Sequence, residues 1–293
     1  MRVMVLVKAS KDSEAGIMPA EELLVEMGHF NEKLIEAGLI LSGEGLQPSS
    51  KGVRIQFSGD QRKVVDGPFA ETKELVAGFW IWKVASMEEA IEWAKKCPNP
   101  TGEEGCLEIR PIFEVEDFGE ALTPEVLRQE AGFRAVTHGL EQPRFVHGPA
   151  MTIVGLNASY DKETRNNIPS QWQQFAPLIG KVPGQVDGMT AYGVCWKFQD
   201  NCKFDYLAGV EVSNPESLLD GMTTVHVPAS EYAVFTYPGH VSQLPQAIDT
   251  IWSKWLPESG LKAGSTPAFE KYSEEYNPET GTGGMEIWVP LQP

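Results

Sequence analysis

The sequence predicts an α+β protein of two domains, and three observations predict it. The chain has 293 residues, whereas a single domain usually has about 100 to 200. Residues 1–118 follow the order strand, helix, strands, helix, strand, and residues 150–293 repeat one strand–helix–strand–strand order twice. Residues 119–149 between them carry little apolar periodicity. We therefore expect two domains joined by a linker that holds one short helix, Pro124–Ala135.

The first domain is expected to start with a strand at 2–8 and a helix that begins after Pro19 and ends at Gly38. A second helix, 87–96, follows Ser86, whose hydroxyl can accept a hydrogen bond from a free amide of the first turn. Alternating apolar residues predict the remaining strands at 39–46, 53–58, 78–84 and 106–115. This order is that of a split β-α-β, ferredoxin-like sandwich. Because one sheet face of such a sandwich has no helix over it, we expect a homodimer through this domain.

The second domain reads as a duplicated β-α-β-β module with a mainly antiparallel sheet. The first copy comprises a strand at 151–160, a helix at 168–180 and strands at 189–198 and 204–213. The second copy comprises a strand at 231–240, a helix at 244–255 and strands at 267–276 and 284–290. The last strands of the copies, around Gly209–Val212 and Gly284–Ile287, each place one glutamate among apolar neighbours. Two copies of a small module predict a shared cleft between them.

Composition excludes several classes of function. The chain has 41 acidic and 24 basic residues and a formal charge of -17, which disfavours a nucleic-acid partner. The linker helix is too short and too acidic for a DNA-reading helix-turn-helix. No apolar run is long enough for a signal peptide or a membrane span, so we expect no membrane partner and a cytoplasmic location. The four cysteines show no CxxC spacing and no cluster has metal-ligand spacing, so we expect neither a metal nor a cofactor.

A nine-residue motif marks the first domain. Residues Asp66–Glu74 read DGPFAETKE, and Gly78-Phe79 and Glu108–Pro111 follow. Residues 1 to about 120 thereby resemble the DGPF branch of the YCII-related family, which implies a dimeric ferredoxin-like fold. Relatives carry a catalytic histidine and aspartate, but the histidine position falls near Met27 here. The motif also fits a turn anchored by its phenylalanine; if this domain has chemistry, Asp66 is the candidate catalytic carboxylate.

The second domain resembles the GyrI-like small-molecule-binding family, which is related to AraC-type effector-binding domains. The motifs that carry the resemblance are Ile168-Pro169 with Trp172, Tyr192–Cys195, Phe204–Val212, Tyr237–His240, Phe269–Tyr272 and Glu286–Pro290. The resemblance implies that two β-α-β-β (SHS2-type) modules pair into one sheet with a ligand cleft. Several members bind flat, often cationic aromatic compounds, and some resemble hydrolases that open strained, cyclopropane-bearing electrophiles.

An organic cation is held best by aromatic faces and a carboxylate in a pocket of low dielectric constant. Alternation on strand 268–276 is expected to put Glu270 and Tyr272 on one face, and the closing strand to put Glu286 and Trp288 together. The candidate ligand-binding residues are Tyr192, Trp196, Glu211, Tyr237, His240, Glu270, Tyr272, Glu286 and Trp288. Trp172 and Trp252 fit core packing better than a ligand box, and His240 fits a helix cap better than a ligand donor.

Two functions are compatible with these residues. The preferred interpretation is a binding module that sequesters or senses an amphipathic aromatic compound, cationic or neutral. The alternative is a hydrolase of strained electrophiles, in which Glu286 or Glu270 acts as general base on a water molecule and Tyr272 assists. No nucleophile–base pair with a firm signature is visible in the sequence, which favours binding.

Overall fold

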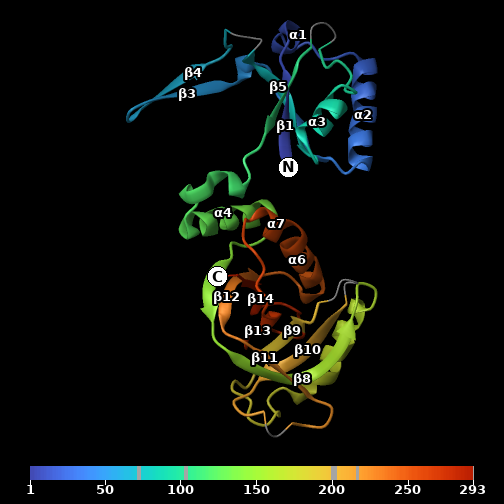
Figure 1. The fold of residues 1–293 in the computed structure, drawn as a ribbon, viewed down its shortest axis with the longest axis vertical. Coiled ribbons are helices and arrows are strands. Elements are labelled where there is room, and N and C mark those ends of the chain that lie inside the picture. Colours follow the sequence, from blue (N-terminus) through green and yellow to red (C-terminus); the bar gives the residue numbers. More distant parts are fainter. Residues whose placement is uncertain (71–73, 102–104, 199–202, 216–217, 293) are drawn as a thin grey trace. The chain divides into compact units, whose positions relative to one another are not determined.

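The computed structural model describes residues 1–70, 74–101, 105–198, 203–215 and 218–292. The chain divides into two compact units, Met1–Phe118 and Gly119–Pro293 (Figure 1). Among the described residues, no helix has the length and hydrophobicity needed to cross a membrane.

The first unit is a four-stranded antiparallel sheet with two helices on one face (Figure 1). Its elements are β1 Arg2–Lys8, α1 Lys11–Glu14, α2 Glu21–Glu36, β2 Ile40–Gly45, β5 Val76–Lys83, α3 Met87–Ala94 and β6 Leu107–Pro111. The strand order β2-β5-β1-β6 is the split β-α-β order of a ferredoxin-like sandwich, as the sequence predicts. The predicted Ser86 cap is present, because its hydroxyl accepts from the amide of Glu89.

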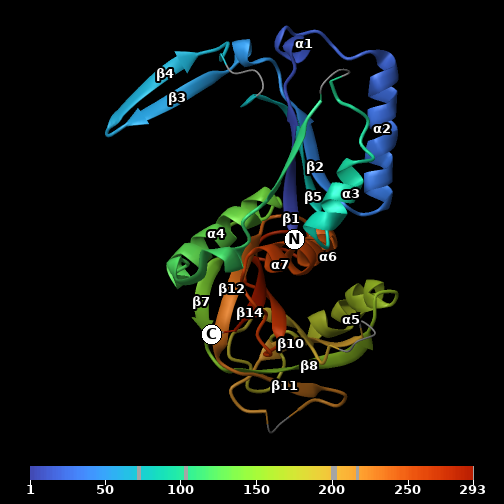
Figure 2. The same ribbon diagram turned by 45° about the horizontal axis from the view of Figure 1, so that its top comes forward.

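One face of this sheet is covered and the other is not. Phe30 and Leu34, one helical turn apart on α2, are buried in a core with Val3, Val5, Trp80 and Trp82. The alternate residues of β1 and β5 point the other way, and no helix of this unit covers them (Figures 1 and 2). They include Met4, Leu6, Phe79 and Ile81, all partly exposed. We call this surface the open sheet face.

A β-hairpin of β3 Val53–Ser58 and β4 Gln61–Asp66 forms a separate two-stranded sheet. Both views show it projecting on the side of the main sheet opposite α2 and α3 (Figures 1 and 2). The sequence did not indicate β4, because Arg62 and Lys63 interrupt its apolar pattern. Phe69 of the DGPF motif lies under the Arg54 guanidinium, 3.9 Å from its carbon to the ring centre. This contact supports the turn interpretation of the motif; residues 71–73 lie outside the described residues.

The second unit is built on an eight-stranded antiparallel sheet in the order β11-β8-β10-β9-β13-β14-β12-β7. Its elements are α4 Pro124–Thr137, β7 Arg144–Gly148, β8 Met151–Tyr160, α5 Ile168–Phe175, β9 Ala191–Trp196, β10 Phe204–Glu211, β11 Thr223–Val227, β12 Ser230–Tyr237, α6 Leu244–Thr250, α7 Leu256–Glu258, β13 Ala268–Tyr272 and β14 Met285–Leu291. A π-helix, Ile251–Trp255, continues α6. The predicted duplication is present as β8-α5-β9-β10 and β12-α6-β13-β14, which join where β9 pairs with β13.

The segment 119–149 is not the linker that the sequence suggests, because it is part of the second unit. Ala131 and Ala135 of α4 are fully buried, and the Trp255 indole donates to the Ala131 carbonyl over 2.8 Å. β7 pairs with β12 at one edge of the sheet. The apolar signal was weak because α4 is buried through alanines rather than through large side chains.

The two faces of the large sheet differ in what covers them. On one face, Phe235 and Ile287 pack with Ile251 and Trp255 from the helical segment after β12. α5 contacts β8 and β10, and its Phe175 packs on the same face with Tyr206 and Val210. We call this the helix side. The opposite side buries a second cluster that includes Ile153, Tyr192, Val194, Tyr232 and Phe269.

Candidate functional site

The helix side of the large sheet holds a carboxylate surrounded by aromatic hydroxyls. Glu270 Oε2 on β13 accepts hydrogen bonds from the hydroxyls of Tyr206, over 2.8 Å, and Tyr272, over 2.9 Å. The indole of Trp172 on α5 donates in turn to the Tyr206 oxygen over 2.8 Å. α5 and β10 belong to the first module and β13 to the second, so both copies of the repeat contribute to this cluster.

A glycine makes room for the cluster. Gly193 on β9 lies directly opposite Glu270 in the sheet register. A Cβ atom there would lie 2.1 Å from the Tyr206 hydroxyl oxygen and 2.6 Å from Glu270 Oε2. Both distances are far inside van der Waals contact, so any larger residue would displace the carboxylate or the hydroxyl.

Among the described residues, Glu270 is a partly buried acid without a cationic partner. Burial raises the pKa of the Glu270 carboxyl, and the hydrogen bonds from Tyr206 and Tyr272 oppose the rise without cancelling it. Burial also raises the pKa of both tyrosine hydroxyls, and the neighbouring carboxylate adds to the rise. In the described part of the chain, Glu270 forms no ion pair with a lysine or an arginine. The hydrogen-bond donors that the described residues offer to this carboxylate are the two tyrosine hydroxyls.

Aromatic rings pack against one another on this side of the sheet. The Trp172 and Tyr272 rings meet edge-to-face with their centres 5.1 Å apart, and Tyr276 packs on Tyr272 at the same distance. Toward α6, the exposed Phe198 stacks on Phe204 at 5.9 Å and approaches Trp252 at 6.4 Å. The cluster can therefore offer several ring faces to a bound molecule.

An ion pair joins the helical parts of the two modules. Arg165, just before α5, donates two hydrogen bonds to Asp249 on α6, over 2.9 and 2.8 Å. The guanidinium lowers the pKa of the Asp249 carboxyl. Both side chains are partly exposed, so this pair contributes little to stability. It nevertheless links the helical segments of the two modules.

Residues 141–292 match the family of GyrI-like small molecule binding domains. The chain belongs to this family. Residues 1–116 match the YCII-related domain, so the order of the two domains is the one that the sequence motifs predict.

Curated relatives cover parts of the chain. The transcriptional regulator BrlR of Pseudomonas aeruginosa is 31% identical over 149 residues, which are 50% of this chain and 54% of BrlR. This chain thus spans about half the length of that relative. An uncharacterized protein of Rhizobium meliloti, R00369, is 33% identical over 92 residues, which are 31% of this chain and 74% of R00369.

Among solved structures, SAV2435 bound to tetraphenylphosphonium is similar, with 20% identity and a TM-score of 0.44. The similarity covers 51% of this chain and 93% of SAV2435.

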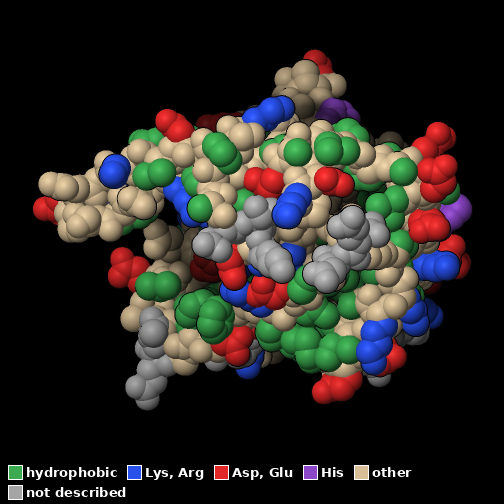
Figure 3. Space-filling view, turned by 90° about the horizontal axis from the view of Figure 1, so that it is seen from above, with side chains coloured by type: hydrophobic (Ala, Val, Ile, Leu, Met, Phe, Trp, Pro, Cys, Tyr) green, Lys and Arg blue, Asp and Glu red, His purple; other side chains and the backbone are tan. Residues whose placement is uncertain are grey.

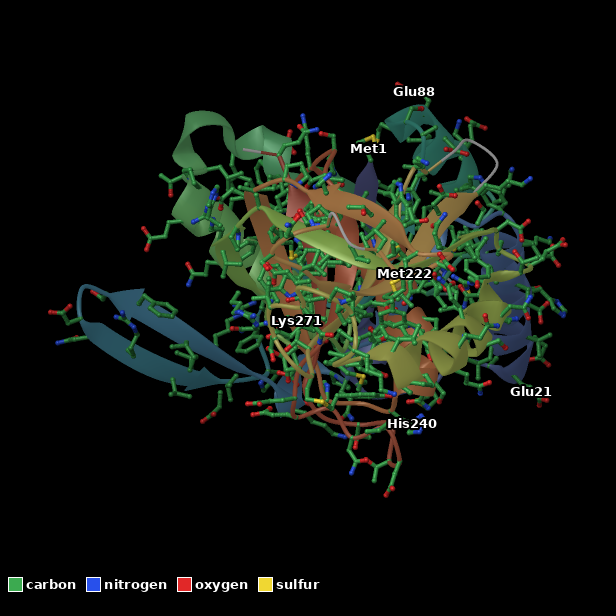
Figure 4. The ribbon with its side chains drawn as sticks, turned by 90° about the horizontal axis from the view of Figure 1, so that it is seen from below. Met1, Glu21, Glu88, Met222, His240 and Lys271 are labelled. Atoms are coloured by element: carbon green, nitrogen blue, oxygen red, sulfur yellow. The ribbon has the colours of Figure 1, made fainter. Side chains whose placement is uncertain are left out.

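Five of the predicted site residues lie on the other side of this GyrI-like sheet. The register pairs Glu270 with Ile287 and Lys271 with Glu286, so Glu270 and Glu286 point in opposite directions. The residues on the opposite side are Tyr192, Trp196, Glu211, Glu286 and Trp288. The expectation of one pocket with both glutamates is therefore wrong: alternation was correct along each strand, but the register between strands could not be read from sequence. Figure 4 labels Lys271, the neighbour of Glu286 on that side.

Glu286 has the cation that Glu270 lacks. Arg144 on β7 donates to Glu286 Oε1 over 2.7 Å, and the Trp288 indole donates to Oε2 over 2.9 Å. On the same side, the Tyr192 hydroxyl donates to Glu211 over a long 3.5 Å hydrogen bond. Burial raises the pKa of the Tyr192 hydroxyl. Glu286 and Arg144 therefore have the contacts of a structural ion pair. The Tyr192 hydroxyl has the hydrogen-bond acceptor that a buried phenol requires.

Tyr237 and His240 form the end of β12 and the turn after it. His240, labelled in Figure 4, accepts at Nδ1 from the amide of Ser242 over 3.1 Å, which confirms the cap interpretation. Tyr237 donates to the His240 carbonyl over 3.3 Å. Tyr237 also lines a cavity of about 280 Å³ between α6 and the turn after α4. Glu270 is not among the residues that line this cavity.

In the YCII-related domain, Asp66 ends β4 and is exposed, opposite Val53 in the hairpin. His29 on α2 is exposed as well, whereas Met27 packs against the core. Asp66 and His29 lie on separate elements, the hairpin and α2.

Sequence reasoning missed two members of the Glu270 cluster. Tyr206 lies inside the motif Phe204–Val212, and alternation puts it on the same side as Ala208 and Val210. That signal alone indicates only a core residue, because its neighbours are apolar. Trp172 was assigned to the core, yet its indole nitrogen donates to Tyr206 and its ring is only partly buried. Only the contacts between the modules distinguish these residues from ordinary packing.

Proposed function

We propose that this protein binds amphipathic aromatic cations in the Glu270 cluster of its GyrI-like domain. One observation carries the proposal: Glu270 is a partly buried carboxylate held by two tyrosine hydroxyls, with no lysine or arginine paired to it in the described chain. A bound organic cation would supply the missing opposite charge.

The rings add to this preference for a cation. A cation over an aromatic face gains about 0.5–2 kcal/mol, more where water is excluded. Trp172 and Tyr272 already touch each other, so a flat ligand that enters between these two rings would displace Trp172. Such entry would need α5 to move relative to α6, which the Arg165–Asp249 pair resists. Neutral aromatics can use the rings but leave the charge of Glu270 uncompensated.

The biological role that fits this activity is sequestration or sensing. BrlR is a transcriptional regulator, and the chain shares with it a segment of 149 residues. We propose that the shared segment is a ligand-sensing part. Cytoplasmic location and the lack of a nucleic-acid partner stay predictions.

A hydrolase remains the second candidate, and the raised pKa of Glu270 is the observation in its favour. A carboxylate of raised basicity can take a proton from water, while Tyr272 or Tyr206 donates to a developing oxyanion. Incubation with a cyclopropyl-bearing electrophile separates the two functions. Catalytic formation of a water adduct supports the hydrolase, and saturable binding without product supports the binding module.

We also propose that the protein is a homodimer through the open sheet face of its YCII-related domain. Met4, Leu6, Phe79 and Ile81 form the apolar centre of this face. Charged pairs lie beside them, Arg2 with Glu114 and Lys8 with Glu108. An apolar centre with a polar rim is typical of a protein interface.

The test of ligand binding is a titration with tetraphenylphosphonium and, in parallel, with neutral triphenylphosphine oxide, followed by tryptophan fluorescence. The proposal predicts saturable quenching by the cation and at least tenfold weaker binding of the neutral compound. Equal affinities would contradict a role for the charge of Glu270.

A further inference from the structure

The hairpin of the YCII-related domain, Val53–Asp66, presents an apolar surface to solvent; we call it the arm. Its register puts Val53, Ile55 and Phe57 on the same face as Val64. Their exposed fractions are 60, 44, 71 and 59%. A two-stranded hairpin is marginally stable at best in water, and four large apolar side chains on one of its faces need a cover.

The arm is also basic, in a chain whose formal charge is -17. Between residues 51 and 66 the basic residues are Lys51, Arg54, Arg62 and Lys63, and the acidic ones are Asp60 and Asp66. Arg62 is on the apolar face near the tip of the arm and lies over the Phe57 ring, 4.4 Å from its centre; Asp66 is on the same face at the base, and Arg54 and Lys63 are on the other face. Figure 3 shows basic and hydrophobic side chains on the projecting arm. A partner surface that is both acidic and apolar would fit it.

The outer face of α2 is such a surface. Leu24, Val25 and Ile35 are each more than half exposed, and a Cβ at Gly28 would meet no other atom. Helical spacing puts three acids on this outer face: Glu21, Glu32 and Glu36. Glu21 marks the start of α2 in Figure 4. Phe30 and Leu34 occupy the opposite, buried face of the helix.

The direction and the length of the arm determine whether it can contact its own α2 or the α2 of a second copy. The arm projects on the side of its own sheet away from its own α2 (Figures 1 and 2). A second copy seated on the open sheet face would have its sheet about 10 Å away. The helices of that copy would lie on the far side of its sheet. Strands of six residues extend for about 20 Å at ~3.4 Å per residue, which spans that distance. The α2 helix is 16 residues or about 24 Å long, comparable to the arm.

We propose that the arm of one copy lies across α2 of a second copy, with Phe57 and Ile55 on the apolar stripe of Leu24, Val25 and Ile35 and with Arg62 beside Glu32 and Glu36. Twofold symmetry makes the contact reciprocal, so each dimer contains two such clasps. This inference rests on the homodimer proposed above and names the elements that hold it.

A charge-swap pair tests the inference on the full chain. One variant carries Arg62→Glu on the apolar face of the arm, and the other carries Glu32→Lys and Glu36→Lys on α2. All three side chains are exposed, so folding should be unaffected. We expect each variant alone to dimerise at least tenfold more weakly by sedimentation equilibrium, because like charges then face each other in both clasps. Mixing the two variants restores opposite charges in both clasps and should give a heterodimer of near wild-type affinity.

Two further variants test the apolar contact and control for the change in net charge. Phe57→Ser should weaken the dimer at least tenfold and leave the melting temperature of the monomer unchanged. Glu274→Lys with Glu275→Lys changes net charge as much as the α2 variant does, but in the GyrI-like domain, and should leave the dimer intact.

A wild-type dimer that none of the arm or α2 changes weakens, or two weakened variants that do not restore each other, would overturn the clasp and leave the dimer standing. A wild-type chain that stays monomeric would overturn both the dimer and the clasp. Neither result bears on the binding of cations at Glu270.

Discussion

The two sides of the large sheet contain the same kinds of residue and differ in how charge is compensated. On the helix side, Glu270 is bonded to hydroxyls only. On the opposite side, Glu286 is bonded to the Arg144 guanidinium as well as to an indole. Each glutamate has a tryptophan close by, so ring content alone does not separate a ligand site from a structural ion pair. We therefore take Glu270, which has no cationic partner among the described residues, as the better candidate for a ligand site than Glu286.

The largest effect is expected at the glycine that makes room for the cluster. Gly193→Val would place carbon atoms where the Tyr206 hydroxyl and the Glu270 carboxylate now lie. We expect loss of tetraphenylphosphonium binding by about a hundredfold or more and a destabilised fold, since overpacking costs about 1–3 kcal/mol. Gly155→Val on β8, also tightly packed, is the matched control for destabilisation without loss of the site. Undiminished affinity in folded Gly193→Val would remove Glu270 from the site.

Removal of one hydroxyl should have a smaller effect. Tyr206→Phe deletes one of two donors to Glu270 and the acceptor of the Trp172 indole, while keeping the ring. The pKa of Glu270 should then rise further, because a hydrogen bond that lowers it is lost. We expect several-fold weaker cation binding near neutral pH, measured by fluorescence titration. The corresponding change on the opposite side, Tyr192→Phe, should leave the affinity as it is.

A change in pH should also distinguish the Glu270 side of the large sheet from the opposite side. The folded-state pKa of Glu270 is raised, so its charged form destabilises the ligand-free fold, and that destabilisation grows as pH rises through the folded pKa. Ligand-free Glu270→Gln should therefore melt higher than wild type at neutral pH, with the difference vanishing below the unfolded pKa of about 4.3. Cation affinity should move the other way and fall as pH drops through the folded pKa. Thermal melts and titrations from pH 4 to 8 check both trends, and a flat affinity profile would argue against Glu270.

The smallest effect is expected at the ion pair between the modules. Asp249→Asn removes the charge that holds Arg165, and the pair is partly exposed, so stability should change by less than about 1 kcal/mol. Ligand association should become a few-fold faster, because α5 and α6 separate more easily. Stopped-flow fluorescence measures this rate; an unchanged rate would place the entry route elsewhere.

Much of the fold could be predicted from the sequence, because strand and helix periods are local. The strand Met151–Tyr160 and the duplicated order of elements are examples. Two kinds of feature could not be predicted. The helix α4 is buried through alanines, which carry little apolar signal, and the sides of Glu270 and Glu286 depend on a register that no single strand contains. Glu270 and Tyr272 were predicted as partners because they lie two residues apart on one strand, whereas Tyr206 and Trp172 join them only through tertiary contacts.

The central claim is tested most directly by comparing Glu270→Gln with Glu286→Gln in tetraphenylphosphonium titrations at neutral pH. Loss of a charge-assisted contact of about 1.5–3 kcal/mol corresponds to roughly tenfold to hundredfold. The account predicts that loss for Glu270→Gln and wild-type affinity for Glu286→Gln. Wild-type affinity in Glu270→Gln, or a loss confined to Glu286→Gln, would contradict it.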